Sequence, residues 1–179
     1  SKHPVTDISE FSGLTIRVME NDIFMATMSA LGINPVPMAW SEVFTSIQNG
    51  TVDGTSNPPV TIYTASIHTI AKYFTVANMI YSPIPVIMSK FTYDTLPEDY
   101  QKLMYEAAEA ASVVEYQFID ELEETAFAAF EEAGVEVTFF TEEQIAECKQ
   151  LMLDKVWPQF VGSSVDQADI DAINAAAKG

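Results

Sequence analysis

The chain of 179 residues is poor in the residues that carry covalent, metal and nucleic-acid chemistry: it has one cysteine, two histidines and one arginine. The single cysteine, Cys148, excludes a disulfide framework within the chain and a cysteine-rich zinc site. Eight lysine and arginine residues stand against 26 aspartates and glutamates, which gives a formal net charge of −18. Nucleic acids and anionic membrane surfaces bind through basic footprints, so this balance argues against both as partners.

Long hydrophobic runs are also missing. No uninterrupted apolar stretch approaches the ~20 residues of a membrane-spanning helix, and the longest candidate, Ile80–Met88, is interrupted by Ser82 and two prolines. The opening residues 1–10 lack the basic and then apolar pattern of a signal peptide and do not begin with methionine, so we expect a processed or truncated product. With 48% hydrophobic and 11% aromatic residues, the chain can still bury a core, and wholesale disorder is excluded.

Strand and helix patterns alternate along the first half of the chain. We expect strands at 13–19 and 36–39, and helices at 22–31, 42–49 and 62–71. Asn21 and Ser41 are placed to cap the first two of these helices. This alternation predicts an α/β layer with a parallel sheet.

The second half of the chain is dominated by one long helical pattern. Tyr73–Ser89 predicts extended chain that ends in a strand at Pro85–Ser89. Thr95–Glu98 predicts a capping box, and the helical pattern after it continues without a breaker to Ala133 and is closed by Gly134. At ~1.5 Å per residue this helix would span roughly 54 Å, too long for a globule with a radius of gyration near ~16 Å. The helix is therefore either kinked or a strut that touches more than one lobe. We expect a strand at 135–140, a second capping box at Thr141–Gln144 that opens a helix to about Phe160, and a last short helix at 166–177.

Arg17, the single arginine, falls near the carboxyl end of the first predicted strand, the edge at which open α/β sheets bind ligands. Its planar guanidinium can hold a carboxylate through two parallel hydrogen bonds. In so negative a chain, anion capture needs a specific and partly desolvated cation of this kind. The alternative is a structural ion pair between Arg17 and one of the 26 acids.

Three more side chains are candidates for the same site. Asn57, in the loop Asp53–Pro59, offers an amide that can help to hold a carboxylate, although Asn-Pro is also a common turn. Trp40 is either an exposed wall for a ligand or an ordinary core residue. Glu20 lies next to the start of a helix, where its charge suits the helix dipole.

The remaining groups form no recognisable catalytic or metal-binding pattern. His3 and His68 have no acidic or cysteine partner at ligand spacing, so no metal site is expected, and Cys148 has no nearby histidine. No phosphate-binding glycine loop or hydrolase signature occurs, and no cofactor is expected. Acid pairs on the long helix, such as Glu123–Glu124, predict a solvated face, while a catalytic pair among the many acids stays open.

Several stretches resemble the DctP-type solute-binding proteins of TRAP transporters. They are GLTIRV at Gly13–Val18, ALGINPVPMAWSEVFTSIQNGTVDG at Ala30–Gly54, SNPP at Ser56–Pro59, and the later runs KYFTVANMIYSPIPVIMSK and TLPEDYQKLMYEAAEAA. The similarity covers nearly the whole chain, in order and with few gaps. It implies an α/β lobe of the type II periplasmic-binding-protein kind, here incomplete, with a long helix that spans two lobes.

The resemblance also implies a function. Such proteins are periplasmic receptors without enzymatic activity, which close on a small organic acid and deliver it to the membrane permease. By position, Arg17 would grip the substrate carboxylate, Asn57 would assist and Trp40 would pack over the ligand. Met19 and Glu20 depart from the family pattern, and an acid beside the site speaks against a sugar acid and for a substrate with hydroxyl or amine donors.

The resemblance implies an organisation into lobes. We expect residues 1–82 and 123–179 to form lobe two, which binds the ligand, and residues 83–122 to be a return segment of lobe one that includes the first part of the long helix. Without the rest of lobe one, apolar faces such as Ile84–Met88 would lie uncovered. We therefore expect a fragment that forms a homodimer or associates with a missing N-terminal half, and that binds ligand weakly or not at all by itself.

Two other classes of function remain open at this point. One is an enzyme subunit that acts on a carboxylate substrate with a glutamate as base. The other is an acidic interaction domain that uses its long helix as a partner surface.

Overall fold

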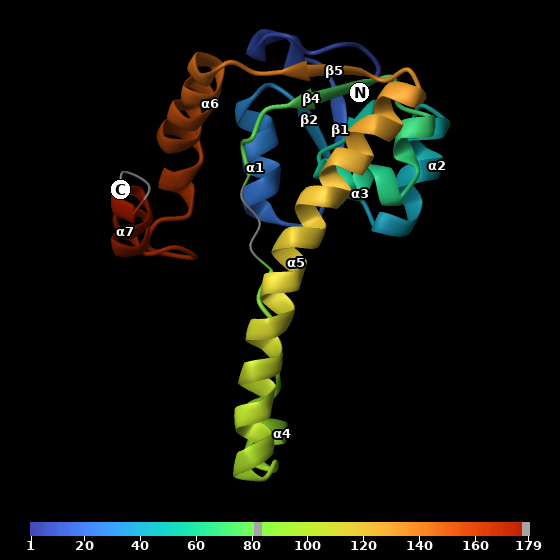
Figure 1. Ribbon diagram of the computed structural model, residues 1–179. Helices are drawn as coiled ribbons and strands as arrows, with labels where there is room; N and C mark the ends of the chain where they lie inside the picture. Colours follow the sequence, from blue (N-terminus) through green and yellow to red (C-terminus); the bar gives the residue numbers. More distant parts are fainter. Residues whose placement is uncertain (81–83, 177–179) are drawn as a thin grey trace.

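The structure, a computed structural model, describes residues 1–80 and 84–176 (Figure 1). Within these residues, five strands form two parallel sheets: β1 (Thr15–Val18), β2 (Asn34–Pro37) and β3 (Gly54–Thr55) in the order β2-β1-β3, and β4 (Tyr73–Val76) beside β5 (Glu136–Phe139). The predicted α/β class with parallel strands is confirmed.

Helices alternate with these strands. They are α1 (Asp22–Ala30), α2 (Val43–Gln48), α3 (Pro59–Thr64), α4 (Lys90–Asp94), α5 (Glu98–Glu132), α6 (Glu142–Lys155) and α7 (Gln167–Ala176), with 3-10 turns η1 (Ile8–Phe11), η2 (Trp40–Glu42), η3 (Ile67–Thr69) and η4 (Trp157–Gln159). None of the helices in the described residues is long and apolar enough to cross a membrane. Residue 177, where we expected the last helix to end, lies outside the described residues.

Two cores hold the body together. In the first, Leu14, Ile16 and Val18 pack with α1 and α6, and in the second, Phe130 of α5 packs with residues from α2, α3 and η3. Because side chains alternate along a strand, the inward direction of Ile16 and Val18 places Arg17 on the opposite face of β1. The core packing thus fixes the direction in which the single arginine points.

Two of the four predicted helix caps are confirmed. The Thr141 hydroxyl accepts from the Gln144 backbone N–H at 3.2 Å, and the Gln144 side chain accepts from the Thr141 N–H at 2.9 Å, which forms the predicted capping box of α6. Asn21 caps α1, since its Oδ1 accepts hydrogen bonds from the backbone N–H groups of Ile23 and Phe24 at 3.0 and 3.1 Å. Ser41 lies inside η2 instead of capping α2, which begins without a side-chain cap. The chain there enters the helix through a 3-10 turn, so the predicted cap is wrong.

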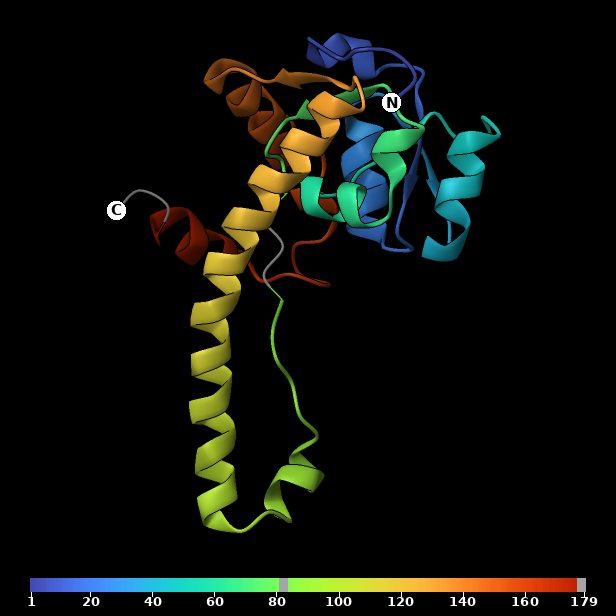
Figure 2. The same ribbon diagram turned by 45° about the vertical axis from the view of Figure 1, so that its right-hand side comes forward.

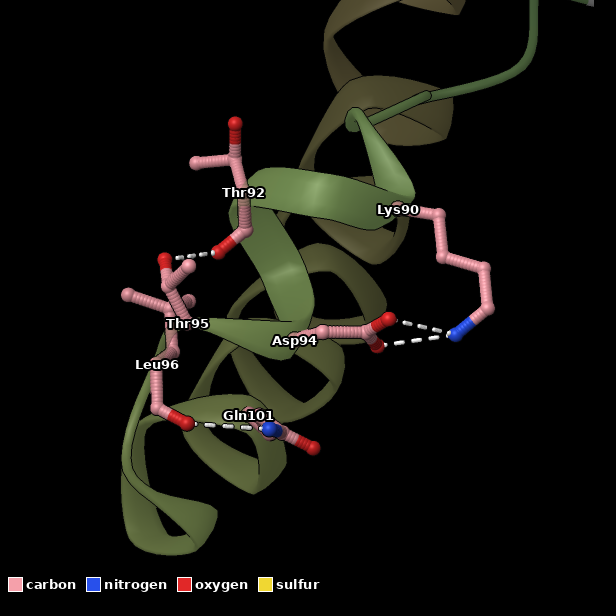
Figure 3. A network of polar contacts seen from close by, with 6 residues as sticks. All are labelled: Lys90, Thr92, Asp94, Thr95, Leu96 and Gln101. Atoms are coloured by element: carbon pink, nitrogen blue, oxygen red, sulfur yellow. Dashed lines mark hydrogen bonds and ion pairs between the residues drawn. The ribbon is translucent and has the colours of Figure 1, made fainter.

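The capping box predicted at residues 95–98 is wrong as well. The Thr95 hydroxyl donates to the Thr92 carbonyl, and the Gln101 amide donates to the Leu96 carbonyl, at 2.7 and 2.9 Å (Figure 3). Pro97 occupies the N-cap of α5 and has no side-chain group to cap it. The Thr95 side chain therefore bonds back to α4 and does not cap α5.

Residues 84–121, here called the arm, leave the body, which comprises residues 1–80 and 122–176 (Figures 1 and 2). The arm holds α4 and the first two thirds of α5, and none of its residues is buried. The long helical pattern is confirmed as one unbroken helix of 35 residues. That this helix touches more than one lobe stays a prediction. The strand predicted at residues 85–89 is not formed: no described strand runs beside this segment, and a strand needs a partner for its backbone hydrogen bonds.

Candidate functional site

Arg17 is held from two sides near the carboxyl end of β1. Its Nε and Nη2 atoms donate to the carbonyl oxygen of Met38 at 3.0 and 2.8 Å, just beyond the end of β2. The ring of Trp40 lies on its face, with 5.3 Å from the guanidinium carbon to the ring centroid. The arginine is only 5% exposed, so its guanidinium is fixed before any ligand arrives.

The guanidinium of Arg17 keeps hydrogen-bond donors that no described residue uses. The bonds to Met38 occupy the Nε–H and one Nη2–H, which leaves the end of the fork, formed by Nη1 and the other Nη2–H, for a second acceptor. Burial lowers the pKa of Arg17 from its ordinary value, but a guanidinium stays charged near neutral pH. Three ion pairs occur in the described part of the chain, and none involves Arg17, which speaks against the structural ion pair as its role.

Asn57 is linked to Arg17 through β3. Thr55 is the register partner of Arg17 in the sheet, and its hydroxyl donates to Oδ1 of Asn57 at 2.8 Å. This bond orients the amide so that its NH₂ group remains available as a donor. Asn57 directly precedes Pro58 and the first turn of α3, which hold the loop in place.

A pocket of about 250 Å³ lies where three strands end. Its described lining is Met19 after β1, Ser56, Asn57, Pro58 and Pro59 after β3, Phe74, Thr75, Val76, Ala77, Asn78, Met79 and Ile80 along and after β4, Phe24 of α1 and Glu123 of α5. Ligands of open α/β sheets bind at the carboxyl ends of parallel strands, so the pocket has the position that the fold predicts.

The structure brings some of the predicted site residues together. Arg17 and Trp40 are in direct contact, and Asn57 is joined to the same strand edge, but of the four candidates only Asn57 lines the pocket. Trp40 is 42% exposed, so it is not the core residue of the alternative interpretation, and its role as a wall for a ligand stays a prediction. Glu20 is exposed, and no polar contact of its side chain is present among the described residues.

Most of the pocket lining was not predicted from the sequence, and Glu123 and Asn78 are the clearest cases. Glu123 was expected on a solvated face, but it is half-buried and lines the pocket, whereas its neighbour Glu124 is exposed. Asn78 also lines the pocket, with a left-handed backbone at φ 46°. Its only signal in the sequence is its place after a strand, and Glu123 has no signal that separates it from the other acids of α5.

His68 packs against aromatic rings and Cys148 is buried, and neither lines the pocket. The ring of His68 packs between Tyr63 and Phe130, with centroids 5.6 and 5.7 Å away. Cys148 is buried, and burial, together with the charge of Glu147, raises the pKa of its thiol. Among the described residues, no three histidine, cysteine, aspartate or glutamate side chains come together as a metal site.

Comparison with solved structures defines the class of protein: its neighbours are TRAP periplasmic solute-binding proteins. One, from Ochrobactrum anthropi, with its C-terminus bound in its ligand-binding pocket, is 28% identical with a TM-score of 0.89 and matches 99% of this chain and 55% of its own. Another, from Bradyrhizobium sp. BTAi1 in complex with α/β-D-galacturonate, is 31% identical with a TM-score of 0.81, over 91% of this chain and 53% of its own.

The chain belongs to the DctP family, bacterial extracellular solute-binding protein family 7, whose sequence model matches residues 1–163. The C4-dicarboxylate-binding periplasmic protein DctP of Rhodobacter capsulatus is 36% identical over 135 residues, which make up 73% of this chain and 39% of that protein. The chain spans between 35% and 47% of the length of the curated relatives that it matches. These relatives are binding proteins of transport systems, and neither the enzyme nor the acidic interaction domain describes the family.

Proposed function

We propose that this chain binds a small organic carboxylate reversibly, with the end of the Arg17 fork on the carboxylate and the Asn57 amide as a further donor. One observation carries the proposal: in a chain of net charge −18, the single guanidinium is buried, fixed by Met38 and Trp40, and left with donors that no described residue uses. A charge-assisted bidentate contact is the strongest hydrogen-bonding use of such a group.

The family membership supports a wider role. The relatives named above bind a C4-dicarboxylate and galacturonate, both organic acids, in proteins of the periplasm. We propose that the present chain acts in the same compartment and delivers its ligand to the membrane permease of a TRAP transporter. Delivery to the permease is a step of a whole solute-binding protein. The present chain covers about half of each solved structure named above.

The lobe organisation is a proposal of the same kind. We propose that residues 1–82 and 123–179 form the ligand-binding lobe and that residues 83–122 belong to the other lobe. No residue of the arm is buried and none belongs to either core, and both observations support this division. The boundary residues 82 and 83 lie outside the described residues.

The test is a titration of the isotope-labelled chain with galacturonate and succinate, followed by NMR chemical shifts, which detect millimolar binding. Arg17→Ala should weaken binding of both acids by roughly 30-fold or more, because it removes the partner of a desolvated charge. Arg17→Lys should retain part of the affinity, since it keeps the charge and loses the fork.

Lys72→Ala is the matched control. Lys72 precedes β4 and lies at the end of that strand opposite the pocket, so this variant removes a positive charge without touching the site. Binding of acids to Arg17→Ala that equals binding to the unaltered chain contradicts the proposal. A complete lack of binding by the unaltered chain contradicts it as well.

A further inference from the structure

The pocket that Asn57 lines contains more polar groups than a carboxylate needs. Ser56, Asn78 and Glu123 line it together with Asn57, and no side-chain hydrogen bond or ion pair of the first three is present among the described residues. The rest of the lining is largely apolar, with Met19, Phe24, Phe74 and Ile80 among its members. A ligand that only presented a carboxylate to Arg17 would leave these polar groups without partners.

Glu123 is the pocket residue that bears on which chemical group a ligand can carry besides its carboxylate. It is the one charged side chain in the described lining of the pocket, and it is half-buried on α5. A carboxylate in such a position is stabilised by a positive charge, which none of the described lysines supplies. A second carboxylate on the ligand would instead meet Glu123 as a like charge.

The net negative charge of the whole chain also disfavours a second carboxylate on the ligand. With 26 acidic residues and a single arginine, this chain offers one guanidinium to a carboxylate, and its net charge disfavours each further negative charge on a ligand. A ligand without net charge avoids this repulsion and still offers a carboxylate to Arg17. A single molecule with one carboxylate for Arg17 and one positively charged group for Glu123 therefore satisfies both residues.

We infer that the preferred ligand is a small zwitterion, whose carboxylate binds Arg17 and Asn57 while an ammonium-type cation binds Glu123. The inference rests on the proposed carboxylate site and adds the second recognition point. Asn57 is the link between the two, because it is joined to the register partner of Arg17 and also lines the pocket. Asn78 and Ser56 supply acceptors for the remaining N–H groups of the cation.

The experiment compares matched ligands of increasing length. Straight-chain amino acids with a terminal ammonium group, from 3-aminopropanoate to 6-aminohexanoate, are titrated into the full chain beside acids with a methyl group in place of the ammonium. Dicarboxylates of the same lengths form a third series. At the best-fitting length, the zwitterion should bind about fivefold more tightly than its methyl counterpart, as expected for one partly exposed ion pair.

Two variants on adjacent positions of α5 decide the role of Glu123. Glu123→Gln should abolish the preference for the zwitterion and strengthen dicarboxylate binding by a few fold, since the like charge is removed. Glu124→Gln changes the charge of the chain equally but lies on the exposed side of the helix, and it should preserve the preference.

The outcomes separate this inference from the function on which it rests. If acids bind in an Arg17-dependent manner but the zwitterions have no advantage at any length, the inference is wrong and the carboxylate site stands. A preference that survives in Glu123→Gln, or that both glutamine variants reduce equally, also overturns it. If no acid of any series binds, the carboxylate site and the inference fail together.

Discussion

The body and the arm are built from similar side chains, yet they bury them very differently. Helix α5 runs through both regions, and this makes the comparison direct. At its body end, Ala126 and Phe130 are 0% exposed, while in the arm Tyr105 and Tyr116 of the same helix are each 71% exposed. An apolar pattern along a helix therefore predicts a face that can be buried, and the neighbouring elements decide whether it is.

The two regions also differ in the secondary structure that they sustain. A helix satisfies its backbone hydrogen bonds within itself, so α5 continues through the arm without packing against either core. A strand depends on a neighbour, and the segment 84–89 has no regular structure although its composition is typical of a strand. The arm thus retains what local interactions can form and lacks what distant ones must supply.

The largest expected difference between the regions concerns core packing. Phe130→Ala removes a fully buried ring that contacts Phe74, Phe127 and His68, and should lower the free energy of unfolding by about 3–5 kcal/mol. Phe118→Ala, on the same helix but 54% exposed in the arm, should cost less than ~1 kcal/mol. Urea unfolding followed by circular dichroism measures both. Equal losses would mean that the arm is packed in solution.

A smaller difference separates two aspartates. Asp53 in the body accepts from the Thr15 N–H at 2.8 Å and pairs with Lys2 at 2.9 Å, whereas Asp94 in the arm pairs with Lys90 in full solvent. Asp53→Ala should destabilise the chain by about 1–2 kcal/mol, because a strand N–H loses its partner. Asp94→Ala should cost no more than ~0.5 kcal/mol.

The effect of Asp53 should depend on pH. Burial tends to raise the pKa of this carboxyl, but the hydrogen bonds from Thr15 and Lys2 outweigh it and lower the pKa below its ordinary value. A group with a lowered folded-state pKa stabilises the fold above its unfolded pKa, near ~3.9, and loses this contribution as the pH falls through the folded value. The difference between the unaltered chain and Asp53→Ala should be full at neutral pH and shrink below about pH 4. A difference that grows on acidification would contradict this account.

The smallest effect on stability is expected at Ile87, in the irregular segment of the arm that precedes α4. Ile87 is 86% exposed, so Ile87→Ser should change the free energy of unfolding by less than ~0.5 kcal/mol. Fluorescence of an apolar dye should fall, since the arm offers one of its binding surfaces. A loss of stability together with a change in the elution volume on size exclusion would instead reveal that a second copy covers the arm, as expected for a homodimer.

Local interactions account for what the sequence could predict. Asn21 caps α1 because its acceptors and donors lie within three residues, and Arg17 lies near the carboxyl end of its strand because the extent of the strand and the parallel direction follow from the alternating pattern. The unbroken length of α5 follows in the same way from the absence of a breaker. These features need no knowledge of the tertiary arrangement.

The errors lie where distant segments meet. Glu123 and Glu124 are equivalent in sequence, and only the crossing of α5 past the ends of the strands makes one of them a pocket residue. The carbonyl of Met38, which holds Arg17, has no side-chain signature at all. The roles of Arg17, Asn57, Trp40 and Glu20 in ligand binding stay predictions.

Helix α5 also has a mechanical consequence. A rod of this length carries a change of tilt to its far end: a rotation of about 5° around Phe130 displaces Glu98 by roughly 4 Å at ~1.5 Å per residue. Glu123 lies close to that pivot and therefore moves by only a fraction of this distance. The helix acts as a lever, with the pocket beside its short end and the arm as its long end.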